Sequence, residues 1–143
     1  MKSQFAKTTS VVVAIFFLGV VYVGVEGKPR KMQKISDGVW GGQHIRLEVT
    51  NGSATIEYDC ANGTINGPLN LDRSGKFSLT GTHVSEMGGP IRINQPRKGQ
   101  AAQFTGWTDG KKMTLTVKLS DSKEDLGTFS LEKGNDGRLR KCK

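Results

Sequence analysis

Apolar and polar side chains alternate with a period of two beyond residue 42, and turn-forming residues interrupt them about every eight to twelve positions. This pattern predicts strands that each bury one face, and no stretch has helical periodicity. The connections are short, so successive strands are expected to be antiparallel neighbours. The fold class is therefore predicted to be all-β, an antiparallel up-and-down barrel of about eight strands. The predicted strands are 43–50, 54–60, 64–71, 76–85, 101–108, 111–120, 126–132 and 137–141.

Two hairpins set the expected register. An Asn51-Gly52 pair predicts a two-residue type I′ turn, and an Asp109-Gly110 pair predicts a second one. In the first hairpin, apolar residues pair on one face and polar residues pair on the other. The apolar pairs are Val49 with Ala54, Leu47 with Ile56 and Ile45 with Tyr58. The polar pairs are Glu48 with Thr55, Arg46 with Glu57 and His44 with Asp59. The second hairpin is predicted to pair its residues in the same way. Its core-face pairs are Gly106 with Met113, Phe104 with Leu115 and Ala102 with Val117. Its outer-face pairs are Thr105 with Thr114 and Trp107 with Lys112.

The interior of the predicted barrel is either filled or occupied by a ligand. Gly81, Ala102 and Gly106 would leave room on one side. An eight-stranded barrel holds its own side chains or one small ligand, so both alternatives stay open. The large inward candidates are Trp40, Ile45, Leu47, Val49, Ile56, Tyr58, Ile65, Leu69, Leu71, Phe77, Leu79, Phe104, Met113, Leu115, Val117, Leu119, Phe129 and Leu131.

The first residues have the layout of a secretory signal peptide. Lys2 and Lys7 precede an apolar run over 11–25, and small residues close it at Gly24 and Gly27. We therefore expect a signal peptide at 1–27, a basic linker at 28–37 and a barrel domain at 38–143, secreted or periplasmic, with no stable membrane span after cleavage. The competing interpretation is an uncleaved anchor, because 8–25 carries no charge.

Two cysteines, Cys60 and Cys142, lie in the exported part of the chain. An even pair in a small exported protein predicts one disulfide bond. Metal binding is the alternative, but neither cysteine has zinc-ligand spacing, and the chain has only two histidines, His44 and His83. We expect a disulfide and neither a metal nor another cofactor.

The whole chain has a net charge of +8, and the +7 of the exported part is concentrated at its two ends. Basic tails can bind nucleic acid or membrane phosphate. An exported protein rarely meets nucleic acid, and these segments lack interleaved aromatic residues, so solvated tails and no nucleic-acid partner are predicted. The basic residues are Lys28, Arg30, Lys31 and Lys34 at one end, and Lys133, Arg138, Arg140, Lys141 and Lys143 at the other.

Two short motifs resemble known families of small barrels. Gly38-Val39-Trp40 resembles the Gly-x-Trp that opens the calycin barrels, such as lipocalins, fatty-acid-binding proteins and avidins. The resemblance implies a ligand-binding barrel whose opening Trp40 is covered by a late basic residue, Arg138 or Arg140. The stretch 40–60 is also similar to small secreted bacterial proteins without an assigned activity. Residues 58–63 are similar to the Tyr-x-Cys-x-x-Gly of periplasmic lysozyme inhibitors, although the later Ser-Gly-x-x-Tyr loop of that family is absent.

No enzyme motif is present, and no catalytic residue is predicted. His44 opposite Asp59 is interpreted as a surface charge pair. His83 shares parity with Phe77 and Leu79, so it is either a buried histidine or a ligand contact. Trp107 is either covered by the Lys112 stem or a loop, or exposed as an anchor for a partner. The long connection 86–100 contributes the other binding candidates, which are Ile91, Arg92, Arg97 and Lys98.

Two functions follow for a non-catalytic, monomeric binding protein. The first is a carrier of a small apolar ligand inside the barrel. The alternative is a module that binds an extracellular protein, such as an exported protease or hydrolase inhibitor that acts through the 86–100 loop.

Overall fold

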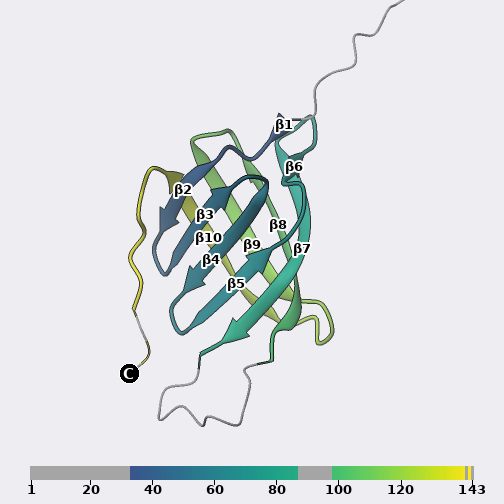
Figure 1. Ribbon diagram of the computed structural model, residues 1–143, viewed down its shortest axis with the longest axis vertical. Coiled ribbons are helices and arrows are strands. Elements are labelled where there is room, and N and C mark those ends of the chain that lie inside the picture. Colours follow the sequence, from purple (N-terminus) through teal and green to yellow (C-terminus); the bar gives the residue numbers. More distant parts are fainter. Residues whose placement is uncertain (1–32, 87–97, 141, 143) are drawn as a thin grey trace, which may run out of the picture. The chain divides into compact units, whose positions relative to one another are not determined.

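Ten strands and no helix are formed by the residues that the computed structural model describes, 33–86, 98–140 and 142. Eight of these strands close into an antiparallel barrel in the order β10-β2-β3-β4-β5-β7-β8-β9 (Figure 1). The predicted all-β, eight-stranded antiparallel barrel is confirmed, and it is compatible with a calycin-like fold. The barrel strands are β2 (Gly38–Gly42), β3 (Ile45–Thr50), β4 (Ser53–Tyr58), β5 (Ala61–Ile65), β7 (Lys76–Ser85), β8 (Gln100–Thr108), β9 (Lys112–Leu119) and β10 (Asp125–Lys133).

The predicted signal segment 1–27 lies outside the described residues, as do most of the 86–100 loop and its candidates Ile91, Arg92 and Arg97. Residues 33–37 of the expected linker are described, and they contain β1 (Gln33–Lys34) and the buried Ile35. Nowhere in the described part of the chain is there a helix long and apolar enough to cross a membrane.

The barrel closes at a different place from the one predicted. The segment before the first predicted strand is itself β2, which pairs with β3 on one side and with β10 on the other. The predicted closing strand at 137–141 is wrong: Gly137 has a φ of 76°, and Arg138 makes only a single parallel bridge with Gln43. Strand β2 can fit between its neighbours because Gly42 has no Cβ, which would overlap with the Ser130 carbonyl of β10.

The predicted strand at 64–71 is divided in two. Its first part belongs to β5, and its last part is β6 (Asn70–Leu71), which pairs with β1 outside the barrel. Gly67 has a φ of 122°, and Pro68 follows it without a backbone N–H. Both residues interrupt a continuous strand, since the first leaves the extended region and the second cannot donate to the ladder.

The register of the first hairpin is confirmed, with Asn51 and Gly52 at φ values of 51° and 82° in the turn. The second hairpin is shifted by two residues, so that Phe104 pairs with Val117 instead of Leu115. The reason is a four-residue turn over 109–112. The Asp109 carboxylate accepts the backbone N–H groups of Lys111 and Lys112, both at 2.7 Å. A shift of two leaves every side chain on its predicted face.

The interior of the barrel is filled by its own side chains. The room expected beside Gly81 and Gly106 is taken by aromatic rings: a Cβ at Gly81 would lie 3.0 Å from the Phe104 ring, and one at Gly106 would lie 2.7 Å from the Phe77 ring. A gap between Leu47, Leu69 and Met113 measures about 10 Å³, which is about the space of one water molecule. This packed core separates the two open ends of the barrel.

Candidate functional site

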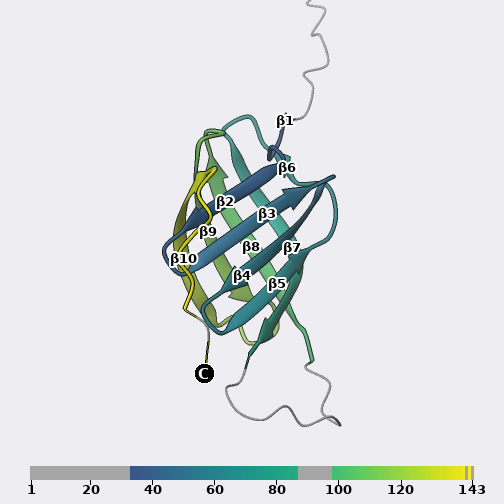
Figure 2. The same cartoon turned by 60° about the vertical axis from the view of Figure 1, so that its left-hand side comes forward.

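A pocket of about 340 Å³ lies at the end of the barrel where β4 and β7 end and where β5 begins. The pairs Tyr58–Ala61 and Ala61–Ser85 bring these three strand ends together, and Figure 2 shows them at the same end of the barrel. Apolar and polar groups both contribute to its wall. The lining residues are His44, Tyr58, Asp59, Cys60, Ala61, His83, Ser85, Leu126 and Phe129.

Tyr58 and His83 are the two buried polar side chains of this pocket, each with 6% of its surface exposed. Their ring centroids are 5.6 Å apart, and the Phe129 ring lies 5.6 Å from Tyr58 on another side. His83 Nε2 forms a hydrogen bond with Ser85 Oγ at 3.3 Å. Tyr58 Oη and His83 Nδ1 have no hydrogen-bond partner within the described part of the chain. Buried polar groups normally have partners, so two orphan atoms on residues of one pocket make this pocket the candidate site.

Burial keeps both of these groups uncharged. Removal from water raises the pKa of the Tyr58 phenol, so the hydroxyl keeps its proton at neutral pH. It also lowers the pKa of His83, an effect that the nearby Glu124 carboxylate opposes. The pocket therefore offers two neutral hydrogen-bonding atoms and no fixed charge from this pair.

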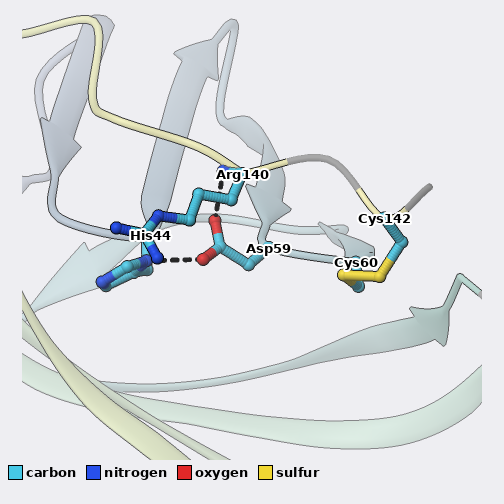
Figure 3. The surroundings of a disulfide bond; sticks show 5 residues. All are labelled: His44, Asp59, Cys60, Arg140 and Cys142. Atoms are coloured by element: carbon cyan, nitrogen blue, oxygen red, sulfur yellow. Dashed lines mark hydrogen bonds and ion pairs between the residues drawn. A yellow bond between two sulfur atoms is a disulfide. The ribbon is translucent and has the colours of Figure 1, made fainter.

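Asp59 lines the rim of the pocket and accepts two hydrogen bonds there (Figure 3). His44 Nδ1 donates to Asp59 Oδ2 at 2.5 Å, and the Arg140 backbone N–H donates to Asp59 Oδ1 at 2.6 Å. The Arg140 amide chiefly, and then the His44 hydrogen bond, lower the pKa of Asp59. Both carboxylate oxygens are thus engaged, and the carboxylate stays ionised at neutral pH.

The predicted disulfide between Cys60 and Cys142 is present beside Asp59 (Figure 3). It joins the end of the chain to the β4–β5 turn, where Cys60 has a φ of 59°. A disulfide is consistent with an oxidising, extracytoplasmic location. It also fixes one wall of the pocket, since Cys60 is a lining residue.

The cation over Trp40 is Lys133 and not an arginine. Lys133 Nζ lies 5.8 Å from the Trp40 ring centroid and donates to Ser36 Oγ at 2.7 Å. Lys133 can reach the ring because β10 continues to the residue that pairs with Trp40. The backbone of Arg138 is instead bonded to Gly42 and His44, and that of Arg140 to Asp59. The expected role of an arginine as the cover of Trp40 is therefore corrected.

Trp107 remains at the surface with 41% of its area exposed. Its Nε1 donates to the Ser74 carbonyl at 2.8 Å, so the ring lies against the turn before β7. The Lys112 amine lies 3.9 Å from Glu132, and Trp107 pairs with Thr114 instead of Lys112. A loop therefore contacts one edge of the ring while much of the residue stays exposed, so both alternatives for Trp107 stay open.

A second hollow, of about 540 Å³, lies beside Trp107, Trp40 and Gly75. The candidate residue Lys98 is exposed two positions before β8, and it is not among the lining residues of either hollow. The Trp107 surface and the Tyr58 pocket therefore do not share a lining residue.

The Tyr58 pocket contains one pair of side chains that resembles part of a catalytic arrangement. The Ser85–His83 hydrogen bond resembles half of a nucleophile–base pair, but such pairs need a third group that orients the histidine. His83 Nδ1 has no such partner among residues 33–86, 98–140 and 142. These same residues also contain no group of three or more side chains that could hold a metal ion. Comparison with known protein families, with curated proteins and with solved structures found no match for this chain.

Proposed function

We propose that the protein is a non-catalytic, secreted or periplasmic binding protein that holds a small molecule in the Tyr58 pocket. The observation that carries this proposal is the pair of buried orphan atoms, Tyr58 Oη and His83 Nδ1, on two residues that line a pocket of about 340 Å³. Ligand pockets of proteins have volumes of about 300–1,000 Å³ and combine apolar walls with a few polar groups. A ligand that completes the two missing hydrogen bonds removes the cost of burying these atoms unpaired.

The packed core supports a site at the mouth instead of inside the barrel. The gap of about 10 Å³ between core side chains cannot hold an apolar ligand. The mouth pocket, in contrast, is open to solvent through exposed Ser85 and has an apolar wall in Phe129 and Leu126. The proposed carrier therefore binds its ligand in the mouth pocket and not, as expected from the sequence, inside the barrel.

The proposed extracytoplasmic location rests on two independent features. The first is the signal-like segment 1–27. The second is the Cys60–Cys142 disulfide, which persists in oxidising compartments.

The proposal is tested by blocking the pocket. Ser85→Trp places a large side chain on the rim, and Ser78→Trp places the same side chain on an exposed position of the same strand as a matched control. We expect native mass spectrometry of the disulfide-bonded protein with a library of small charged and uncharged fragments to show one-to-one adducts. These adducts should be lost with Ser85→Trp and retained with Ser78→Trp. Adducts that survive equally in both variants, or no adduct at all, would contradict the proposal.

Trp107 supports a second candidate function, the binding of an extracellular protein. Exposed tryptophan is enriched among the residues that anchor protein partners, and Trp107 is the large hydrophobic residue that the described chain leaves exposed. A partner bound there should be lost with Trp107→Ala and retained with Tyr58→Phe in a binding assay with the purified partner. Retention of the partner by Trp107→Ala would exclude this surface.

A further inference from the structure

On the basis of the proposed function, we infer that the ligand of the Tyr58 pocket is an uncharged, compact and mainly apolar molecule that carries one hydroxyl or carbonyl oxygen. Three features of the pocket lead to this class: the state of its charges, the placement of its orphan atoms and the nature of its walls.

The Asp59 carboxylate at the rim of the pocket already has hydrogen-bond partners. Both oxygens of Asp59 are engaged, one by His44 and one by the Arg140 backbone amide. The buried part of the pocket contains the neutral groups of Tyr58 and His83 and no lysine or arginine among its lining residues. An anionic ligand would lose its hydration without gaining a free cation, and the field of Glu124 would repel it further. A cationic ligand would have to displace His44 from Asp59.

The two orphan atoms belong to neighbouring rings of the pocket lining, whose centroids are 5.6 Å apart. Tyr58 Oη can both donate and accept a hydrogen bond. His83 Nδ1 donates or accepts according to the direction of the bond between His83 Nε2 and Ser85 Oγ. A hydroxyl oxygen can donate to one of the two atoms and accept from the other, and a carbonyl oxygen can accept from both. A molecule without such an oxygen would leave both atoms unpaired on binding.

The walls require an apolar body of limited size. Leu126 and Phe129 from β10 and Ala61 from β5 contribute apolar surface, and the Phe129 and Tyr58 rings flank each other at 5.6 Å. The volume of about 340 Å³ is near the lower end of the range for ligand pockets. A single-ring compound fits this combination of size and polarity.

Three probes of similar size separate the features. Acetophenone has a carbonyl oxygen, ethylbenzene lacks it, and benzoate carries a negative charge. We expect isothermal titration of the full, disulfide-bonded chain to give a dissociation constant for acetophenone at least about tenfold lower than for either other probe. Tyr58→Phe should weaken acetophenone binding about 3- to 10-fold and leave ethylbenzene binding unchanged. Thr116→Val removes a hydroxyl from the outer wall, where Thr116 bonds Thr128, and should change neither affinity.

The outcomes separate this ligand class from the proposed function. Preferential binding of benzoate that is lost with Ser85→Trp would overturn the uncharged class and leave a binding pocket in place. Equal affinities for acetophenone and ethylbenzene, with no effect of Tyr58→Phe, would overturn the role of the single oxygen. Failure of all three probes would overturn the ligand class, while adducts of the wider fragment library would still decide the proposed function independently.

Discussion

Tyr58 and His83 show how two inward strand positions become a polar pair at the end of the barrel. Each residue is 6% exposed, yet Tyr58 Oη and His83 Nδ1 lack partners among the described residues. A buried orphan donor or acceptor costs about 1–3 kcal/mol of stability. The protein without ligand therefore carries an unfavourable contribution that a ligand oxygen can remove.

Removal of one orphan atom should stabilise the unliganded protein. Tyr58→Phe deletes the unpaired hydroxyl and retains the ring that packs against Phe129 and His83. We expect the free energy of unfolding, measured by urea denaturation, to rise by about 1 kcal/mol. The control Thr116→Val deletes a partnered hydroxyl and should not raise it. A loss of stability in Tyr58→Phe would mean that its hydroxyl is satisfied in solution.

The buried state of His83 predicts a pH dependence of stability. Burial lowers the pKa of His83 in the folded protein below its ordinary value of 6.5. As pH falls below 6.5, the unfolded state binds this proton first, so the free energy of unfolding decreases. We expect His83→Gln to lose this part of the decline between pH 7 and pH 5, as measured by urea denaturation. Identical pH profiles of the two proteins would contradict a lowered pKa for His83.

Sequence alternation predicts where Tyr58 and His83 point but not what they bond. Their inward direction follows from the period of two, and it holds for both residues. Whether a polar atom finds a partner depends on contacts between distant strands, such as those of β4, β7 and β10. The sequence predicts His83 as a candidate contact. It predicts no binding role for Tyr58, Ser85 or Phe129, because their roles depend on these contacts. A useful signal would have been two polar inward residues at neighbouring strand ends.

At the scale of elements, the accuracy of a predicted register depends on the turn. Asn51-Gly52 forms the expected two-residue turn, so every predicted pair of that hairpin within its ladder is observed. Asp109-Gly110 belongs to a four-residue turn because the Asp109 side chain bonds two further backbone amides. The period of two tolerates this shift, and the core of the barrel was still predicted correctly. Strand β2 was missed as a strand because it has three glycines among its five residues.

The glycines of the long strands should be sensitive to a single added methyl group. A Cβ at Gly106 in β8 would overlap with the Thr114 carbonyl and approach the Phe77 ring to 2.7 Å. We expect Gly106→Ala to lower the free energy of unfolding by about 1–3 kcal/mol in urea denaturation. Gly99→Ala is the matched control, since its Cβ would lie 3.6 Å from the nearest atom, and it should change stability by less than about 0.5 kcal/mol. Equal effects of the two substitutions would contradict the packing of β8.

At the scale of the whole molecule, the barrel is closed and its interior is packed with side chains. Pairing of β2 with β10 leaves no free edge in the barrel, so none of its strands offers an unpaired edge for association. The filled interior leaves the ends of the barrel as the places where a ligand can enter. Of the two surface hollows described above, the Tyr58 pocket is the one lined by the two residues with buried orphan atoms.

The disulfide should make a large contribution to the stability of the whole chain. Cys60 and Cys142 are 82 residues apart, and the chain-entropy model assigns about 4 kcal/mol to closing a loop of that length. We expect the double substitution Cys60→Ser and Cys142→Ser to lower the free energy of unfolding by about this amount. A reductant should have the same effect on the unsubstituted protein and none on the variant. Unchanged stability in both tests would mean that the bond does not form in solution.

The location of binding is tested most directly by NMR of the side chains during titration with the fragments that form adducts. The account predicts that the ring signals of Tyr58 and His83 shift together, while the methyl signals of Leu115 and Val117 in the packed core do not. Shifts of the core methyl groups without shifts of the Tyr58 and His83 rings would contradict it, because the ligand would then enter the interior of the barrel.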